Sequence, residues 1–216
     1  TESYALATIF VLLLFATMEE IIKLFVVKTV DQRTLAITKI NDAIKYSIVS
    51  ALGFSFTENV YYLYEFWNNV STNELFGMYI FRSIFTTSAH IFYSVIFGYY
   101  YGIGKFSIQI NEQKQIISGE KDRVGKWISK LFNLPLSEGF RQKLVIKGLI
   151  LALGFHFTIN YLLELQMVLP VIALNVAAYL FLQYLLGRKA GHLIMIIDPS
   201  TKKTSSIAKK DEEVVI

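Results

Sequence analysis

The chain has 216 residues, of which 54% are hydrophobic and only 18% charged, and its mean hydropathy is +0.45. A soluble domain has roughly a quarter of its residues charged, so this composition excludes an ordinary soluble fold and favours a helical membrane bundle. The net charge is +4, and the absence of cysteine excludes disulfides and thiolate metal sites.

Five apolar segments are each long enough to cross a bilayer as a helix, which takes about 20 residues. In chain order they cover residues 4–27, 44–67, 78–104, 144–163 and 167–186. The predicted fold class is therefore all-α, a polytopic transmembrane helical bundle with about five membrane segments. We assign residues 1–197 to one transmembrane domain and residues 198–216 to a tail.

Basic residues occur in alternate connections of this predicted bundle. The first and third connections and the tail hold nearly all the Lys and Arg, whereas the second and fourth hold none. By the positive-inside rule, the N-terminus of this integral membrane protein is expected outside and the C-terminus in the cytoplasm. The positive charge thus reflects topology, and we expect the lipid bilayer, with no nucleic acid, as a partner.

The third connection, residues 105–143, is predicted to be a long basic cytoplasmic loop. Within it, residues 124–134 have apolar side chains at helical spacing, with Lys126 and Lys130 on the opposite face. Two interpretations are open: this stretch lies on the cytoplasmic face of the membrane, or it packs on the bundle as an ordinary loop helix. The tail is rich in Lys, Ser, Thr and Glu and is predicted to be disordered.

Several ionisable residues lie inside the apolar segments, where a charge costs several kcal/mol or more. They are Glu19, Glu20, Lys23, Glu58, His90 and His156. At about 1.5 Å per residue, the two adjacent glutamates and the later histidine lie roughly 12–14 Å from the cytoplasmic edge. The other glutamate and histidine lie near the middle of their helices. Four helices thus bring polar side chains to similar depths, which predicts one shared site.

The spacing of these residues suggests a separate role for each of them. Lys23 is i,i+4 from Glu19 and i,i+3 from Glu20, so it can neutralise one carboxylate and give electrostatic support. The other carboxylate would then be suited to act as a general base. His156 and Asn160 share one face of their helix. Either histidine could instead be a simple helix–helix hydrogen-bonding residue.

Two further expectations concern packing and the outer end of the bundle. Arg82 is expected to extend to the outer membrane interface or to pair with Glu74. Gly53 and Gly154 are expected to let helices approach closely beside the polar positions.

Four motifs follow one another on successive helices. They are Glu19-Glu20-Ile21-Ile22-Lys23, matching EExxK; Phe54-Ser55-Phe56-Thr57-Glu58-Asn59, matching FxxxEN; His90; and His156-Phe157-Thr158-Ile159-Asn160, matching HxxxN. The ordered set resembles the PrsW family of intramembrane proteases and, more distantly, the CAAX-prenyl endopeptidase and bacteriocin-immunity superfamily. The CAAX branch normally has His where Glu58 stands, which favours the first resemblance.

The resemblance, which covers roughly residues 16–163, implies a membrane-embedded endopeptidase that cleaves membrane-anchored protein substrates. Residues 1–197 would then be a protease-like domain in a prokaryotic plasma membrane. The motif positions carried over are Glu19, Glu20, Glu58, His90 and His156.

The expected mechanism is hydrolysis by a glutamate-activated water, with Glu19 or Glu20 as the general base. In one version Glu58, His90 and His156 bind Zn²⁺, because two histidines and a carboxylate form a common catalytic zinc set. In the other version no metal takes part, and the histidines with Asn160 stabilise the oxyanion. The sequence leaves both versions open.

Two other classes of function are compatible with the composition. A small proton- or ion-coupled transporter would also place Glu and His inside the membrane, but its typical inverted repeats and broken helices are not evident. A non-catalytic membrane scaffold or immunity protein could retain the same fold.

Overall fold

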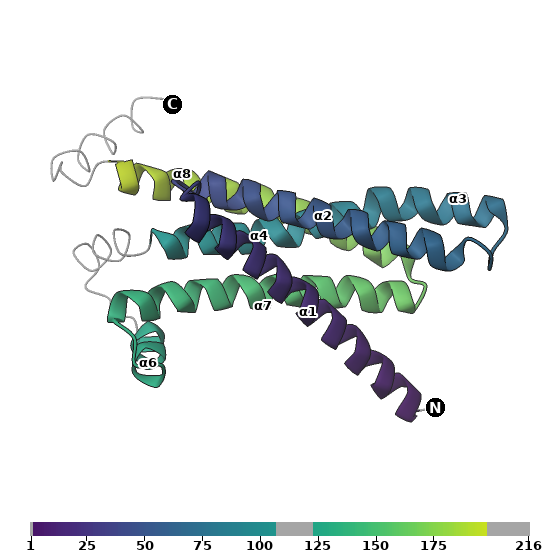
Figure 1. The fold of residues 1–216 in the computed structure, drawn as a ribbon, viewed down its shortest axis with the longest axis horizontal. Helices are drawn as coiled ribbons and strands as arrows, with labels where there is room; N and C mark the ends of the chain where they lie inside the picture. Colours follow the sequence, from purple (N-terminus) through teal and green to yellow (C-terminus); the bar gives the residue numbers. More distant parts are fainter. Residues whose placement is uncertain (1, 107–122, 198–216) are drawn as a thin grey trace.

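The computed structural model describes residues 2–106 and 123–197, and every regular element in these ranges is a helix (Figure 1). The long helices are α1 (Glu2–Thr34), α2 (Ile40–Phe66), α4 (Thr87–Lys105), α7 (Leu136–Glu164) and α8 (Val168–Ile197). The shorter ones are α3 (Thr72–Phe81), the π-helical segment η1 (Arg82–Thr86) and α6 (Arg123–Leu131). The all-α prediction is confirmed.

Two of the described helices combine the length and apolar composition needed to cross a membrane. They are residues Thr72–Lys105, in which α3, η1 and α4 run on continuously, and Ser137–Glu164 of α7. The predicted number of five spans and the orientation of the termini stay predictions. The predicted loop lies partly, and the predicted tail wholly, outside the described residues.

Large apolar side chains on the outside of the bundle suit a lipid environment. Phe10 is 65% exposed, Phe56 70%, Ile150 63% and Leu169 78%, and these residues belong to four different helices. Water would make such extensive apolar exposure unfavourable, whereas hydrocarbon would not.

Helix α4 forms the centre of the bundle and packs against α2, α7 and α8. Gly98 and Gly102, one turn apart on α4, lie against α2: a Cβ at Gly98 would be 2.9 Å from the Ala43 carbonyl oxygen, and one at Gly102 would be 3.0 Å from the Ile40 Cα. Small residues at this spacing let two helix backbones approach closely. The expectation for Gly53 and Gly154 was wrong, because a Cβ at either would meet nothing within 4 Å.

Helix α1 crosses the bundle obliquely, and its N-terminal half diverges from the other long helices (Figure 1). Its C-terminal half packs inward through a stripe at three- and four-residue spacing, formed by Ala16, Glu20, Lys23, Val27 and Asp31, each at most 5% exposed. Three of these five residues are charged. Helix α1 therefore delivers ionic groups to the interior and must find partners for them there.

One set of partners lies near the end of α4, in what we call the anchor cluster: Asp31, Tyr101, Lys105 and the Ile37 carbonyl. The Tyr101 hydroxyl donates a hydrogen bond of 2.9 Å to Asp31, and Lys105 forms an ion pair with the same carboxylate. Lys105 also donates to the Ile37 carbonyl oxygen at 2.7 Å. The cluster thereby fastens the end of α1 and the α1–α2 connection to α4.

Candidate active site between four helices

The ionisable residues singled out in the sequence meet at one place in the bundle. Helix α1 contributes Glu19 and Glu20, α2 contributes Glu58, α4 contributes His90 and α7 contributes His156. The two histidine rings lie edge to face with their centroids 5.2 Å apart. Residues separated by more than a hundred positions in the sequence thus form one polar interior.

Glu20 is the fully buried carboxylate of the site, and all its described contacts are short. Its Oε1 accepts a hydrogen bond of 2.7 Å from Lys23 Nζ and lies 2.8 Å from His156 Nδ1. Glu20 and Lys23 are each only 2% exposed, so this ion pair is shielded from solvent. Because a carboxylate only accepts, His156 Nδ1 carries the proton of this contact.

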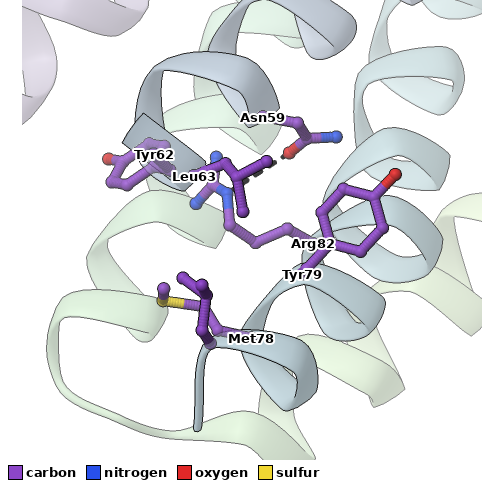
Figure 2. A pocket seen from close by; sticks show the side chains of 7 residues that line it. Asn59, Tyr62, Leu63, Met78, Tyr79 and Arg82 are labelled. Atoms are coloured by element: carbon purple, nitrogen blue, oxygen red, sulfur yellow. Dashed lines mark hydrogen bonds between the residues drawn. The ribbon is translucent and has the colours of Figure 1, made fainter. Parts of the chain in front are cut away.

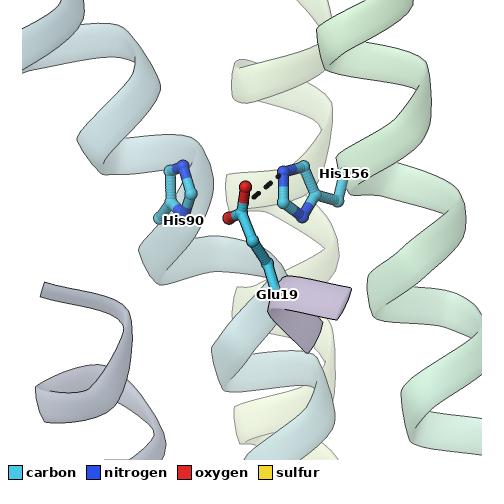
Figure 3. Close-up of side chains that lie close together, drawn as sticks. All are labelled: Glu19, His90 and His156. Atoms are coloured by element: carbon cyan, nitrogen blue, oxygen red, sulfur yellow. Dashed lines mark ion pairs between the residues drawn. The ribbon is translucent and has the colours of Figure 1, made fainter. Parts of the chain in front are cut away.

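This hydrogen bond leaves the other ring nitrogen of His156, Nε2, directed at Glu19 (Figure 3). His156 Nε2 and Glu19 Oε2 are 3.8 Å apart. Both atoms are buried, and neither has a hydrogen-bond partner among the described residues. In neutral imidazole, Nε2 would present a lone pair to a carboxylate oxygen. Two facing acceptors of this kind are satisfied either by a cation between them or by a second proton on His156, which turns the contact into an ion pair.

Glu19, His90 and His156 also satisfy the proximity that a metal ion requires. Each offers one ligand atom, and the three atoms lie within 4.8 Å of one another. The expected set had Glu58 in the place of Glu19. The difference arises because Glu58, on α2, contacts His90 and is held there by other contacts.

Those contacts form a second ionic group. Glu58 Oε2 lies 2.9 Å from His90 Nε2, and Glu58 Oε1 pairs with Arg82 Nη2 at 3.0 Å. Lys23 Nζ lies 3.2 Å from His90 Nδ1. Since an ammonium group can only donate, Nδ1 accepts from Lys23 and Nε2 donates to Glu58. Both nitrogens of His90 are therefore occupied, and a metal ion would have to replace one of these contacts.

Arg82 pairs with Glu58, so the expected pair with Glu74 was wrong, and its expected place at the outer interface stays a prediction. Its guanidinium lies 3.6 Å from the centroid of the Tyr62 ring, and its Nε donates to the side-chain amide oxygen of Asn59 (Oδ1) at 3.3 Å (Figure 2). Glu74 instead accepts hydrogen bonds from Ser71 at the start of α3. A small pocket next to this arginine is lined by Asn59, Tyr62, Leu63, Leu75, Met78, Tyr79 and Arg82.

Tyr93 is a site residue that the sequence analysis missed. Its ring stacks on His156 with centroids 4.7 Å apart and an angle of 8° between the planes. Lys23 Nζ lies 4.7 Å from the centroid of the same ring. Its position one helical turn after His90 was the available signal. Tyr93 fixes the plane of His156 and gives Lys23 a favourable aromatic surface.

Asn160 lies one turn after His156 on α7 and is half-buried. No hydrogen bond joins its side chain to another described residue. Its expected part in oxyanion stabilisation stays a prediction.

Comparison with known proteins supports the family resemblance that rests on the four motifs. Residues 1–120 match the family model described as PrsW family intramembrane metalloprotease. A similar protein is "Protease PrsW" from Geobacillus kaustophilus (strain HTA426), at 35% identity over 94 residues, which cover 44% of this chain and 38% of that relative. No solved structure matches. The matched region contains Glu19, Glu20, Glu58 and His90 and exceeds half of the sequence. The chain belongs to the PrsW family of intramembrane metalloproteases.

Proposed function

We propose that this chain is an intramembrane endopeptidase that hydrolyses peptide bonds of membrane-anchored proteins at the site between α1, α2, α4 and α7. The observation that carries the proposal is the buried pair Glu19 Oε2 and His156 Nε2, which lie 3.8 Å apart and have no hydrogen-bond partner among the described residues. Leaving such atoms unsatisfied costs about 1–3 kcal/mol each, a cost that a catalytic site offsets through its ligand or reaction.

We propose that Glu19, His90 and His156 hold the metal ion implied by the family. When bound, an ion such as Zn²⁺ lowers the pKa of a coordinated water and polarises the scissile carbonyl. The donor set supports this proposal, because one carboxylate and two imidazoles are ordinary zinc ligands, and Glu19 Oε2 and His156 Nε2 have no hydrogen-bond partner among the described residues. In the metal-free alternative, Glu19 takes the proton from water directly.

The remaining charged residues would have positioning roles. Glu20 holds the proton of His156 on Nδ1, so that Nε2 faces Glu19. Lys23 neutralises Glu20 and contacts His90 on the other side. These contacts favour Glu19 over Glu20 as the water-activating or metal-binding carboxylate, a choice that the sequence left open.

Glu58 and Arg82 would face the substrate side of the site. The Glu19 and Glu58 side chains are 22% and 23% exposed, whereas Glu20 and both histidines are at most 4% exposed. The lining of the pocket beside Arg82 includes Asn59, which follows Glu58 in the sequence. A peptide segment would therefore approach from the Glu19–Glu58 side, with His156 and Tyr93 behind it.

Cleavage of a membrane-tethered reporter by the reconstituted protein tests the proposal. Glu19→Gln should reduce the cleavage rate by about 10²–10⁴-fold, the usual contribution of a catalytic acid–base group. Glu164→Gln makes the same chemical change at an exposed position at the end of α7 and should leave the rate unchanged. Persistent cleavage in both Glu19→Gln and His156→Ala would refute the protease assignment.

The metal version has its own measurement. Purified protein should retain zinc, and a chelator should remove both the zinc and the activity, with Zn²⁺ restoring them. His156→Ala should lose zinc without unfolding. Full activity in metal-free protein would contradict the zinc version and favour Glu19 as the base acting alone.

A further inference from the structure

Helix α6 is fixed to the first turns of α7 by a close backbone contact. Gly125 and Ile128 are buried, and a Cβ atom at Gly139 of α7 would lie 2.5 Å from the Gly125 carbonyl oxygen. Such proximity requires glycine on the α7 side. Helix α6 is therefore a docked part of the fold with a defined orientation.

The outward surface of α6 carries an apolar stripe. Val124 is 51% exposed, Trp127 63% and Leu131 57%, and Phe132, just after the helix, is 61% exposed. At about 100° per residue, the first three lie on one side of the helix, adjacent to the side that contacts α7. Trp and Tyr are the residue types enriched at the level of lipid headgroups.

A basic stripe follows on the next face of the helix. Arg123, Lys126 and Lys130 are all exposed, and the helical spacing places them together beside the apolar stripe. The sequence contains no acidic residue between Arg123 and Glu138. A second copy of the chain docking through this same face would bring like charges together, which is unfavourable. An anionic lipid surface offers both the apolar layer and the opposite charge.

The place of α6 in the bundle fits this partner. It lies beside the beginning of α7, turned across the direction of the long helices, at the end where α4 terminates (Figure 1). This is the end where basic residues predict the cytoplasmic side. Further along α7, Ile146 and Ile150 are 40% and 63% exposed, so α7 also carries outward apolar side chains.

We propose that α6 is an interfacial helix that seats this end of the bundle on anionic lipid. Val124, Trp127 and Leu131 enter the boundary between headgroups and acyl chains, and Arg123, Lys126 and Lys130 contact lipid phosphates. This inference does not depend on the protease reaction. The sequence left open whether this stretch lies on the membrane surface or only packs on the bundle. In our proposal it does both.

Tryptophan fluorescence of the full-length chain in vesicles tests the proposal. The chain has two tryptophans, so Trp67→Phe, at the far end of α2, isolates Trp127 without altering α6. In vesicles containing phosphatidylglycerol, Trp127 should emit at short wavelength and be quenched more by lipids brominated near the headgroup than by lipids brominated deep in the chain. Long-wavelength emission without lipid quenching would overturn the proposal.

A charge variant tests the anionic preference. Lys126→Gln/Lys130→Gln should abolish the increase in Trp127 quenching on going from phosphatidylcholine to phosphatidylglycerol vesicles. Lys28→Gln/Arg33→Gln removes two exposed charges from the end of α1 and should preserve the increase. If shielding of Trp127 instead rises with the protein-to-lipid ratio and lipid quenching falls, the occupant is a second protein copy and the lipid proposal fails.

Discussion

Two ionic clusters join α1 to α4, and they differ in how completely their polar atoms are satisfied. In the anchor cluster, each charged or hydroxyl group of Asp31, Tyr101 and Lys105 has a partner. In the candidate active site, Glu19 Oε2 and His156 Nε2 are buried without a hydrogen-bond partner among the described residues. Glu20, Lys23 and Asp31 lie on the same buried stripe of α1, and Glu19 lies beside it, so position along α1 does not by itself explain the difference.

The comparison suggests that a structural cluster gives its buried polar atoms hydrogen-bond partners, whereas a functional cluster leaves some of them without one. A complete set of hydrogen bonds stabilises a single arrangement, whereas a buried gap costs free energy unless something occupies it. The anchor cluster would then hold α1 in place so that Glu19 and Glu20 reach the histidines. Mutations should separate these two roles.

The largest expected effect is on stability at the anchor. Asp31→Asn should lower the free energy of unfolding by about 2–4 kcal/mol, because it leaves the Lys105 ammonium unpaired; partial exposure of Lys105 keeps the value below that of a fully buried pair. Denaturation in mixed detergent micelles provides the measurement. Glu65→Gln, at an exposed position of α2, should have no such effect.

Glu19→Gln should give the opposite result in the same denaturation experiment. It removes a carboxylate with an unpartnered oxygen, so the metal-free protein should be as stable as the parent or more so. A loss of stability comparable with that of Asp31→Asn would contradict the distinction between the two clusters.

Glu20→Gln should weaken metal binding without abolishing it. The change weakens the contact that fixes the proton of His156 on Nδ1, and loss of such outer contacts typically lowers metal affinity by about 10–100-fold. Zinc titration of the reconstituted protein would measure it. Unchanged affinity would show that Glu20 does not orient His156.

Tyr101→Phe should destabilise the protein less than Asp31→Asn does. It removes one hydrogen bond to Asp31 but keeps the Lys105 pair, so the free energy of unfolding should fall by about 1.5 kcal/mol. Cleavage per folded molecule should stay at the parental level. A specific loss of activity would mean that the anchor contributes to the reaction and does more than support it.

The sequence predicted much of the helical framework and the residues of the site because both leave one-dimensional signals. Long apolar runs indicate helices, and Glu19, Glu20, Glu58, His90 and His156 stand out as costly residues within them. Counting residues along a helix gives the depth of a side chain. It was enough to expect that four helices contribute to one site.

Which of these residues contact one another could not be predicted in this way, because the contacts depend on how each helix is rotated and packed. Glu58 was grouped with His156, yet in the structure it pairs with Arg82 and contacts only His90 of the two histidines. Asp31 attracted no attention, because it becomes a buried anchor only where α4 places Tyr101 and Lys105 beside it. Likewise, a glycine permits close approach only where another helix faces it.

The π-helical segment Arg82–Thr86 has a consequence for how this site tolerates change in length. A π turn contains one more residue than the corresponding α-helical turn. Deleting one residue there would convert the π turn into an α-helical turn and leave the parts on either side close to their present orientation. Deleting one residue from the α-helical stretch between Thr87 and His90 would instead rotate His90 by about 100° relative to Arg82, away from its present contacts. The π turn is therefore where this helix best tolerates a change in length between Arg82 and His90.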